Sequence, residues 1–140
     1  GVTVVDDFAH HPTAIAVTVA AARQQWPGRR LVVAFEPRSL TAARRDFAPA
    51  YLETLSRADL VLVAAPYHAD RLAADEVLDR GELARGLEAR GVAALMPGPG
   101  DDPVGVLLPH LRSGDVVIGC SSGSFDDFHG RLLEALQQSS

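Results

Sequence analysis

Two repeating signals in the 140-residue chain predict an α/β fold. Short runs of β-branched and other apolar residues alternate with longer stretches in which apolar residues recur at helical spacing. Nearly every residue of each short run is apolar, which is typical of strands covered on both faces of a parallel sheet. Such alternation gives right-handed crossovers with helices on both sides. We therefore expect a Rossmann-like, open and mainly parallel sheet of five or six strands.

The predicted elements alternate along the whole chain. Strands are predicted at residues 2–5, 31–35, 60–63, 92–96 and 116–118. The first helix begins at Pro12 and ends at Pro27-Gly28. The second begins after Ser39, and Pro49 interrupts its apolar stripe, so we expect a kink or a break there. The later helices are predicted at residues 82–90, from Asp101 or Asp102 with Pro103 to Ser113-Gly114, and from a Ser124/Asp127 capping box onward.

Composition excludes several classes of function. A net charge of −5 with scattered acidic residues is unlike the basic face of a nucleic-acid-binding protein. No apolar run reaches the roughly 20 residues of a membrane span, and the first residues do not resemble a secretory signal. The single cysteine, Cys120, allows no internal disulfide. We therefore expect one cytoplasmic domain that binds neither nucleic acid nor membrane.

The absence of lysine is the most informative feature of the composition. All thirteen cationic residues are arginine. The chain therefore contains no phosphate-gripping P-loop lysine, no Schiff-base lysine and no lysine general base. Any ATP chemistry that needs such a lysine must take it from elsewhere.

Three predicted loops leave the carboxyl edge of the sheet, where open α/β sheets bind ligands. The first, residues 6–12, has the sequence Asp-Asp-Phe-Ala-His-His-Pro. Its carboxylates and imidazoles are compatible with a metal site, an acid–base pair or a nucleotide contact. They are equally compatible with an aspartate that caps the next helix and histidines bonded to loop backbone. Neighbouring side chains point in opposite directions and no third ligand is near, so we predict no metal site.

The other two loops also allow more than one interpretation. In residues 36–39, the planar guanidinium of Arg38 suits a carboxylate or a phosphate, but a surface salt bridge to Glu36 or Asp70 explains it equally well. Residues 119–124 are rich in glycine and serine, so their N–H groups could receive an anion, or they could form a simple turn with a helix cap. This loop is neither a dinucleotide-binding motif nor a P-loop, and it lacks the elbow of a nucleophilic serine.

Together, the three loops resemble the C-terminal domain of the Mur ligases. Residues 6–13 are similar to the segment that opens that domain. Residues 35–39, followed by Arg44, Arg45 and Phe47, are more similar to the murein peptide ligase branch than to the L-alanine-adding branch. Residues 122–125 with His129 favour the same branch. The resemblance covers nearly the whole chain in the right order.

This resemblance implies part of an ATP-dependent ligase of peptidoglycan recycling. Such an enzyme joins UDP-N-acetylmuramate to the tripeptide L-Ala-γ-D-Glu-meso-diaminopimelate through an acyl phosphate. ATP and Mg²⁺ are held mainly by a central P-loop domain that, like the N-terminal UDP-binding domain, is absent from this chain. Residues 1–140 would form the lid that closes over the site and excludes water. We therefore expect no catalytic residue in this chain and no activity from it alone.

The resemblance also implies which residues contact the ligands. Contacts with ATP are expected from Asp7, His10 and His11. Contacts with the peptide are expected from Phe8, Arg38, Ser39, Thr41, Ser122, Gly123, Ser124 and Phe125. Two alternatives remain. One is the same domain of UDP-N-acetylmuramate–L-alanine ligase, with a smaller acceptor pocket, and the other is a non-catalytic module that binds a nucleotide or an anion.

Overall fold

Five parallel strands form a single sheet in the computed structural model of the chain. The structure describes residues 1–7, 9, 11–37, 48–65, 79–98, 100–121 and 125–139. The strands are β1 (Thr3–Asp7), β2 (Leu31–Phe35), β3 (Leu60–Val63), β4 (Ala93–Leu95) and β5 (Val116–Cys120). Their order in the sheet is β1-β5-β2-β3-β4, and every pairing is parallel. The last strand of the chain therefore lies between the first two.

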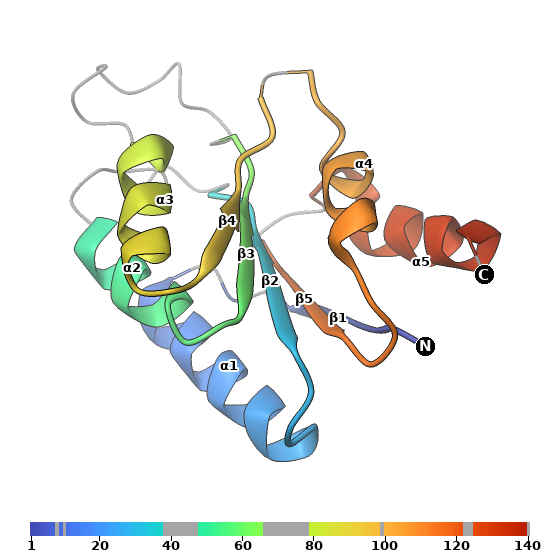
Figure 1. The fold of residues 1–140 in the computed structure, drawn as a ribbon, viewed down its shortest axis with the longest axis horizontal. Helices are drawn as coiled ribbons and strands as arrows, with labels where there is room; N and C mark the ends of the chain where they lie inside the picture. Colours follow the sequence, from blue (N-terminus) through green and yellow to red (C-terminus); the bar gives the residue numbers. More distant parts are fainter. Residues whose placement is uncertain are drawn as a thin grey trace.

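Helices cover both faces of the sheet (Figure 1), which confirms the predicted fold class. One face carries α1 (Pro12–Gln25), α2 (Ala48–Leu55) and α3 (Arg80–Ala89). The other face carries α4 (Pro103–Leu107), the 3₁₀ turns η3 (Leu108–His110) and η4 (Phe125–Asp127), and α5 (Phe128–Ser139). None of the described helices is long and apolar enough to cross a lipid bilayer.

The continuous apolar runs of the central strands are explained by this three-layer arrangement. Every residue of β2 and β3 is buried. On β2, Leu31, Val33 and Phe35 pack in the cluster beneath α1, α2 and α3, whereas Val32 and Ala34 pack in the cluster beneath α4 and α5. Because successive side chains point to opposite faces, a strand covered on both faces has no position for a polar side chain.

Strands β1 and β5 each extend two residues beyond their predicted ends. Asp6 and Asp7 of β1 pair in register with Gly119 and Cys120 of β5. On β1 the prediction stopped at Val5, and the backbone pairing continues through two aspartates because it does not depend on side-chain polarity. On β5 the prediction stopped before Gly119, and the strand continues to the buried Cys120.

Two helices near the C-terminus differ from prediction. The fourth helix ends at Leu107, not near Ser113-Gly114, and a 3₁₀ turn follows to His110. Pro109 lies in that turn, and proline cannot donate the hydrogen bond that would continue an α-helix. The last helix begins at Phe128, after a 3₁₀ turn, and not directly after Ser124, which lies outside the described residues.

Backbone conformation explains the late start of α5. Phe125 and Asp127 have φ values of 50° and 55°, in the left-handed region. Residues in that region cannot belong to a right-handed α-helix. In the second predicted helix, Pro49 lies in the first turn of α2, where a missing N–H is tolerated. Pro49 therefore stands at the beginning of α2 instead of kinking it, and the predicted part before Ala48 lies outside the described residues.

Candidate functional site at the carboxyl edge of the sheet

The stems of the three predicted loops lie side by side. Asp7 at the end of β1 and Phe35 at the end of β2 are both in register with Cys120 at the end of β5. Because the three strands are adjacent and parallel, the segments that follow them leave the same edge of the sheet. The strand order thus brings together loops that are far apart in the sequence.

The helices that follow these three strands do not all lie on the same face of the sheet. The chain after β1 and after β2 continues into α1 and α2 on one face, whereas the chain after β5 continues into α5 on the other face (Figure 1). In open α/β sheets, ligands bind outside the carboxyl ends of strands where neighbouring connections separate in this way. The end of β5 is therefore the place at which a ligand-binding crevice is expected.

Hydrogen bonds connect the three stems beyond the end of the strand pairing. The Glu36 N–H donates to the Cys120 carbonyl at 3.0 Å, and the Ser121 N–H donates to the Asp7 carbonyl at 3.3 Å. The Ser121 hydroxyl donates to Glu36 Oε1 at 2.8 Å, and Ser121 is buried. Sequence analysis missed this contact, because it considered Glu36 only as a salt-bridge partner of Arg38. No local sequence signal indicates a pair that lies 85 positions apart.

Asp7 is held at the end of β1 through both of its carboxylate oxygens. Oδ1 accepts the N–H of Ala9 at 2.8 Å, and Oδ2 accepts from the hydroxyl of Thr18 at 3.2 Å, which shares its proton with the Ala14 carbonyl at 3.1 Å. The N-cap of α1 is His11, whose side chain makes no capping hydrogen bond. The interpretation in which Asp7 caps α1 is therefore wrong. Asp7 instead closes a tight turn directly after β1 and is fixed in place by the helix.

A hydrogen bond joins the first turn of α1 to α2. Thr54 of α2 is buried, and its hydroxyl donates to the Pro12 carbonyl at 3.2 Å. This contact fixes the first turn of α1 beside His11, one of the predicted ATP contacts. The predicted partners Phe8 and His10 lie outside the described residues.

The only cysteine of the chain is part of the core. Cys120 is fully buried at the end of β5. Burial, with smaller contributions from the charges of Asp7 and Asp6, raises the pKa of its thiol to about 12. The thiol is therefore protonated at neutral pH and is not a nucleophile or a metal ligand at this edge. Among the described residues, no group of three His, Cys, Asp or Glu side chains could hold a metal ion.

Phe125 begins the 3₁₀ turn η4, directly before α5. Its side chain is buried, and its ring stacks on that of Phe128 with centroids 4.7 Å apart. Both rings belong to the core cluster beneath α4 and α5. The other predicted peptide contacts, Arg38, Ser39, Thr41, Ser122, Gly123 and Ser124, lie outside the described residues.

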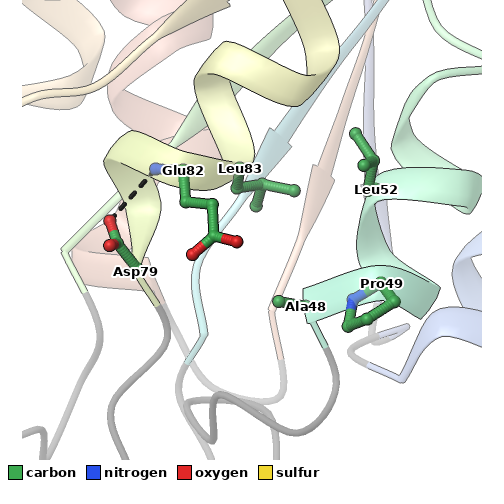
Figure 2. Close-up of a pocket in the computed structure, with 6 residues that line it drawn as sticks. All are labelled: Ala48, Pro49, Leu52, Asp79, Glu82 and Leu83. Atoms are coloured by element: carbon green, nitrogen blue, oxygen red, sulfur yellow. Dashed lines mark hydrogen bonds between the residues drawn. The ribbon is translucent and has the colours of Figure 1, made fainter. Parts of the chain in front are cut away.

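A hollow of about 260 Å³ lies at the same edge, between the N-terminal ends of α2 and α3 (Figure 2). Pro49, Leu52 and Leu83 supply apolar surface, and the carboxylates of Asp79 and Glu82 lie beside it. Asp79 also caps α3, because its Oδ1 accepts the N–H of Glu82 at 3.0 Å. Sequence analysis did not identify this hollow, since it is formed by two helices whose packing no local motif specifies.

Comparison with known proteins identifies the family to which this geometry belongs. A model of the Mur ligase, glutamate ligase domain matches residues 1–123. The chain is a Mur ligase C-terminal domain. The predicted resemblance is thereby confirmed at the level of the family.

Two curated relatives of this Mur ligase domain are UDP-N-acetylmuramate–L-alanine ligases. The protein of Burkholderia cenocepacia is 37% identical over 137 residues, which is 97% of this chain and 29% of the relative. The protein of Aromatoleum aromaticum is 38% identical over 134 residues, which is 95% of this chain and 28% of the relative. The chain thus spans less than a third of the curated relatives that it matches.

Solved structures of Mur ligases have the same fold. The murein peptide ligase of Psychrobacter arcticus matches with a TM-score of 0.73 and 29% identity, over 96% of this chain and 27% of that one. A Haemophilus ducreyi domain, described as that of a UDP-N-acetylmuramate:L-alanyl-γ-D-glutamyl-meso-diaminopimelate ligase, matches with a TM-score of 0.70 and 28% identity. That match covers 96% of this chain and 91% of the other.

Proposed function

We propose that the chain is the C-terminal domain of an ATP-dependent ligase that joins UDP-N-acetylmuramate to L-Ala-γ-D-Glu-meso-diaminopimelate in the cytoplasm. The observation that carries this proposal is the convergence of the β1, β5 and β2 ends, since it brings the stems of all three family-like loops to one edge. In this proposal ATP and Mg²⁺ are held mainly by a central domain. The domain described here closes over the site and does not act alone.

Asp7 is proposed to bind the ribose of ATP. Each of its oxygens accepts one hydrogen bond within the protein, from Ala9 or from Thr18. A carboxylate oxygen has more than one acceptor site, so the ribose hydroxyls can still donate to Asp7. The two internal bonds would hold the carboxylate in one orientation before the nucleotide arrives, which lowers the entropic cost of binding. His11, at the start of α1, is proposed to lie beside the same nucleotide.

Arg38 is proposed to bind a carboxylate of the incoming tripeptide. It follows Glu36, whose side chain accepts from Ser121 at the end of β5. That bond ties the stem of the Arg38 loop to the stem of the Ser122–Phe125 loop, which is proposed to form the opposite wall of the peptide site. A guanidinium can hold a carboxylate through two parallel hydrogen bonds. Binding of this kind would fix the peptide amine for attack on the acyl phosphate.

The decisive experiment uses the full-length ligase that carries this domain. We expect Arg38→Ala to raise the KM for the tripeptide about tenfold or more, because a charge-assisted hydrogen bond contributes roughly 1.5–3 kcal/mol. The KM for ATP should change much less. Arg85→Ala removes an exposed guanidinium of α3 and is the matched control. Equal effects of Arg38→Ala on both substrates, or none on either, would contradict the role of Arg38.

A second candidate is the C-terminal domain of UDP-N-acetylmuramate–L-alanine ligase. The curated relatives with 36–38% identity carry that name, whereas the murein peptide ligase structures are 28–29% identical. ADP release by the full-length enzyme, measured separately with free L-alanine and with the tripeptide, distinguishes the two. Preference for L-alanine would replace the tripeptide assignment and leave the family unchanged.

A test on the isolated chain examines its proposed dependence on the other domains. Residues 1–140 contain no lysine, so we expect no release of phosphate from ATP when the chain is incubated with either acceptor and UDP-N-acetylmuramate. Turnover by the isolated chain would overturn the proposed division of labour. The absence of turnover together with an inactive full-length protein would overturn the ligase assignment itself.

A further inference from the structure

Arginines gather at the amino edge of the sheet, opposite the candidate site. Five of the thirteen lie on the turns and helix ends of that edge: Arg23, Arg29, Arg30, Arg57 and Arg112. The protein as a whole carries a net charge of −5. A surface lined by an excess of one sign of charge raises the local concentration of ions of the opposite sign.

The carboxylates of this edge are already paired. Asp59 Oδ2 lies 3.1 Å from the Arg23 guanidinium and also accepts the N–H of Leu31. Asp115 is buried and receives two hydrogen bonds from Arg30, at 3.0 and 2.7 Å. These two arginines are therefore neutralised, and each is fixed in one geometry by its partner.

Two further arginines at this edge are not neutralised. Arg29 donates to the Thr3 hydroxyl at 3.1 Å and to the carbonyls of Gly114 and Asp115, and all three acceptors are uncharged. The exposed Arg112 guanidinium makes no hydrogen bond or salt bridge within the part of the chain that the structure describes, although its charge helps to lower the pKa of Asp115. The fifth arginine, Arg57, lies 3.9 Å from the Glu53 carboxylate. Arg29 and Arg112 thus leave the amino edge with a surplus of two positive charges, and Arg29 is held by its three hydrogen bonds.

The surplus charges face two adjoining hollows of about 340 and 290 Å³. Gly28, Arg29 and Arg30 line both hollows. Arg112, with Ser113 and Gly114, lines the second. Gly28 has a φ of +79°, and nothing lies within 4 Å of the place where a side chain would begin, so its turn leaves the space between the arginines open.

We propose that these hollows form a binding site for a small, multiply charged oxyanion of the di- or triphosphate class. Guanidinium forks match phosphate oxygens, and a fixed fork loses little entropy when it binds. The volumes of the two hollows lie near the lower end of the range for small-molecule sites, and the carboxylates that line them, Asp59 and Asp115, are already paired with Arg23 and Arg30. A five-residue strand separates the two edges of the sheet by about 16 Å, so this site is distinct from the candidate ligase site.

Titration of the ¹⁵N-labelled chain with inorganic pyrophosphate tests the site. We expect saturable shifts of the backbone amide signals of Gly28, Ser113 and Gly114, with smaller changes at Asp7 and Ser121. Trp26 is the only tryptophan, and its carbonyl accepts the Arg29 N–H, so its fluorescence provides an independent reading near the site. Binding should weaken as KCl is raised, because added salt screens exposed charges.

Arg112→Gln is the informative variant. It removes a surplus charge without breaking a side-chain hydrogen bond among the described residues, and it leaves the backbone bond from the Arg112 N–H to Asp115 intact. We expect about tenfold weaker pyrophosphate binding, which corresponds to the loss of one charge-assisted contact. Arg85→Gln removes the same charge from an exposed position on α3 and should leave binding unchanged.

Three outcomes would overturn the proposal. Saturable shifts confined to Asp7 and Ser121 would place the anion at the carboxyl edge. Equal weakening by Arg112→Gln and Arg85→Gln would show a response to net charge alone. An absence of saturable shifts at low salt would show that the arginines only anchor the turns of this edge.

Discussion

At the scale of single residues, the candidate site depends on side chains that are fixed before a ligand binds. Asp7 accepts from Ala9 and Thr18, and Glu36 accepts from Ser121. The hydrogen-bond partners of Asp7 lie 2 and 11 positions away in the sequence, whereas the partner of Glu36 lies 85 positions away. Together they fix the carboxylates at the ends of β1 and β2, on either side of β5, which is the arrangement that a preorganised binding site requires.

Asp7→Asn in the full-length ligase tests the nucleotide role. Asparagine keeps an acceptor for the Ala9 N–H but loses the charge and one acceptor oxygen. We expect the KM for ATP to rise about tenfold, while the KM for the acceptor changes little. Asp6→Asn is the control, because Asp6 is exposed and adjacent on the same strand. Initial-rate measurements that give equal ATP dependence for both variants would argue against Asp7 as a ribose contact.

Arg80 shows how an arginine can act structurally at the same edge. Its guanidinium donates to the Val63 carbonyl at 3.0 Å and to the Pro97 carbonyl at 2.8 Å. Burial lowers the pKa of Arg80, but arginine remains charged at any pH at which proteins are folded. The side chain therefore satisfies the carbonyl of the last residue of β3 and a carbonyl beyond the end of β4.

Arg80→Met should reduce the free energy of unfolding by about 1–2 kcal/mol. Methionine fills much of the same space but leaves both carbonyls without this donor. Arg85→Met is the matched control on α3, since Arg85 is exposed. Urea unfolding of the isolated chain, followed by circular dichroism, measures the difference. Equal stability of the two variants would indicate that Arg80 contributes only surface charge.

Residue contacts of this kind were the least predictable part of the molecule. The family resemblance singled out Asp7 from a local cluster of candidates, and the structure puts it at a strand end beside β5. Sequence reasoning did not foresee the contact of Ser121 with Glu36 or that of Arg80 with two carbonyls. These contacts join residues brought together only by the sheet or by helix packing, and no short motif encodes such an arrangement.

At the scale of elements, one aspartate links α4 to α5 in addition to their shared apolar core. Asp102 Oδ1 accepts the N–H of Val104 at 3.1 Å, as an N-cap, and also receives the Arg131 guanidinium at 2.7 Å. The hydrogen bond from Arg131 is the largest influence on the pKa of Asp102 and lowers it. One carboxylate thus caps the N-terminus of α4 and accepts a hydrogen bond from α5.

Asp102→Ala should destabilise the chain by about 1 kcal/mol through loss of the helix cap. Asp102→Asn should cost less, because the amide oxygen can still accept from Val104. Thermal unfolding of both variants under one buffer condition separates the cap from the ion pair. If alanine and asparagine behaved alike, the ion pair and not the cap would be the important contact.

The bounds of helices and strands were predicted well where an apolar pattern repeats. They were predicted poorly where the backbone conformation of single residues determines where an element begins. The bounds of β2 and β3 agree with the predicted runs, since their burial on both faces requires unbroken apolar sequence. The start of α5 was misplaced because Phe125 and Asp127 adopt left-handed conformations. Such conformations favour glycine, so these two residue types gave no warning.

At the scale of the whole molecule, a buried ion pair closes the amino edge. Burial opposes the charge on Asp115, but the hydrogen bond from Arg30, the Arg112 N–H and nearby guanidinium charges outweigh it and lower the pKa of Asp115. The unfolded chain, with an ordinary pKa of about 3.9, therefore binds this proton more readily. The stabilisation is complete above that value and is lost as pH falls through the lower pKa of the folded state.

Asp115→Asn should lower the free energy of unfolding by about 2 kcal/mol at pH 7, because Arg30 loses a charged partner. The difference from the wild type should shrink as the pH falls below the ordinary aspartate pKa of about 3.9 and through the lower pKa of Asp115 in the folded state. Urea unfolding across this range measures both effects. Glu134→Gln, at an exposed position of α5, is the control. A difference that is independent of pH would contradict a role for the Asp115 charge.

The order of the strands in the sheet could not be predicted from the sequence, although the kind of sheet could. The alternation of runs and helices predicted a mainly parallel sheet, and the structure confirms it. The order β1-β5-β2-β3-β4 was not predicted, because apolar runs of similar composition do not specify their neighbours. Family resemblance suggested that the three loops meet, and strand order is the physical reason that their stems do.

The position of β5 in the sheet has a consequence for how the domain folds during its synthesis on the ribosome. Strands β2, β3 and β4 can associate as soon as they have been synthesised, whereas β1 has no neighbour until β5 emerges. Asp7 precedes Cys120 by 113 positions, so its strand gains a partner only after Cys120 has been synthesised. The corner proposed to receive the nucleotide is therefore completed late in translation, so an interrupted nascent chain would present β1 as an unsatisfied edge.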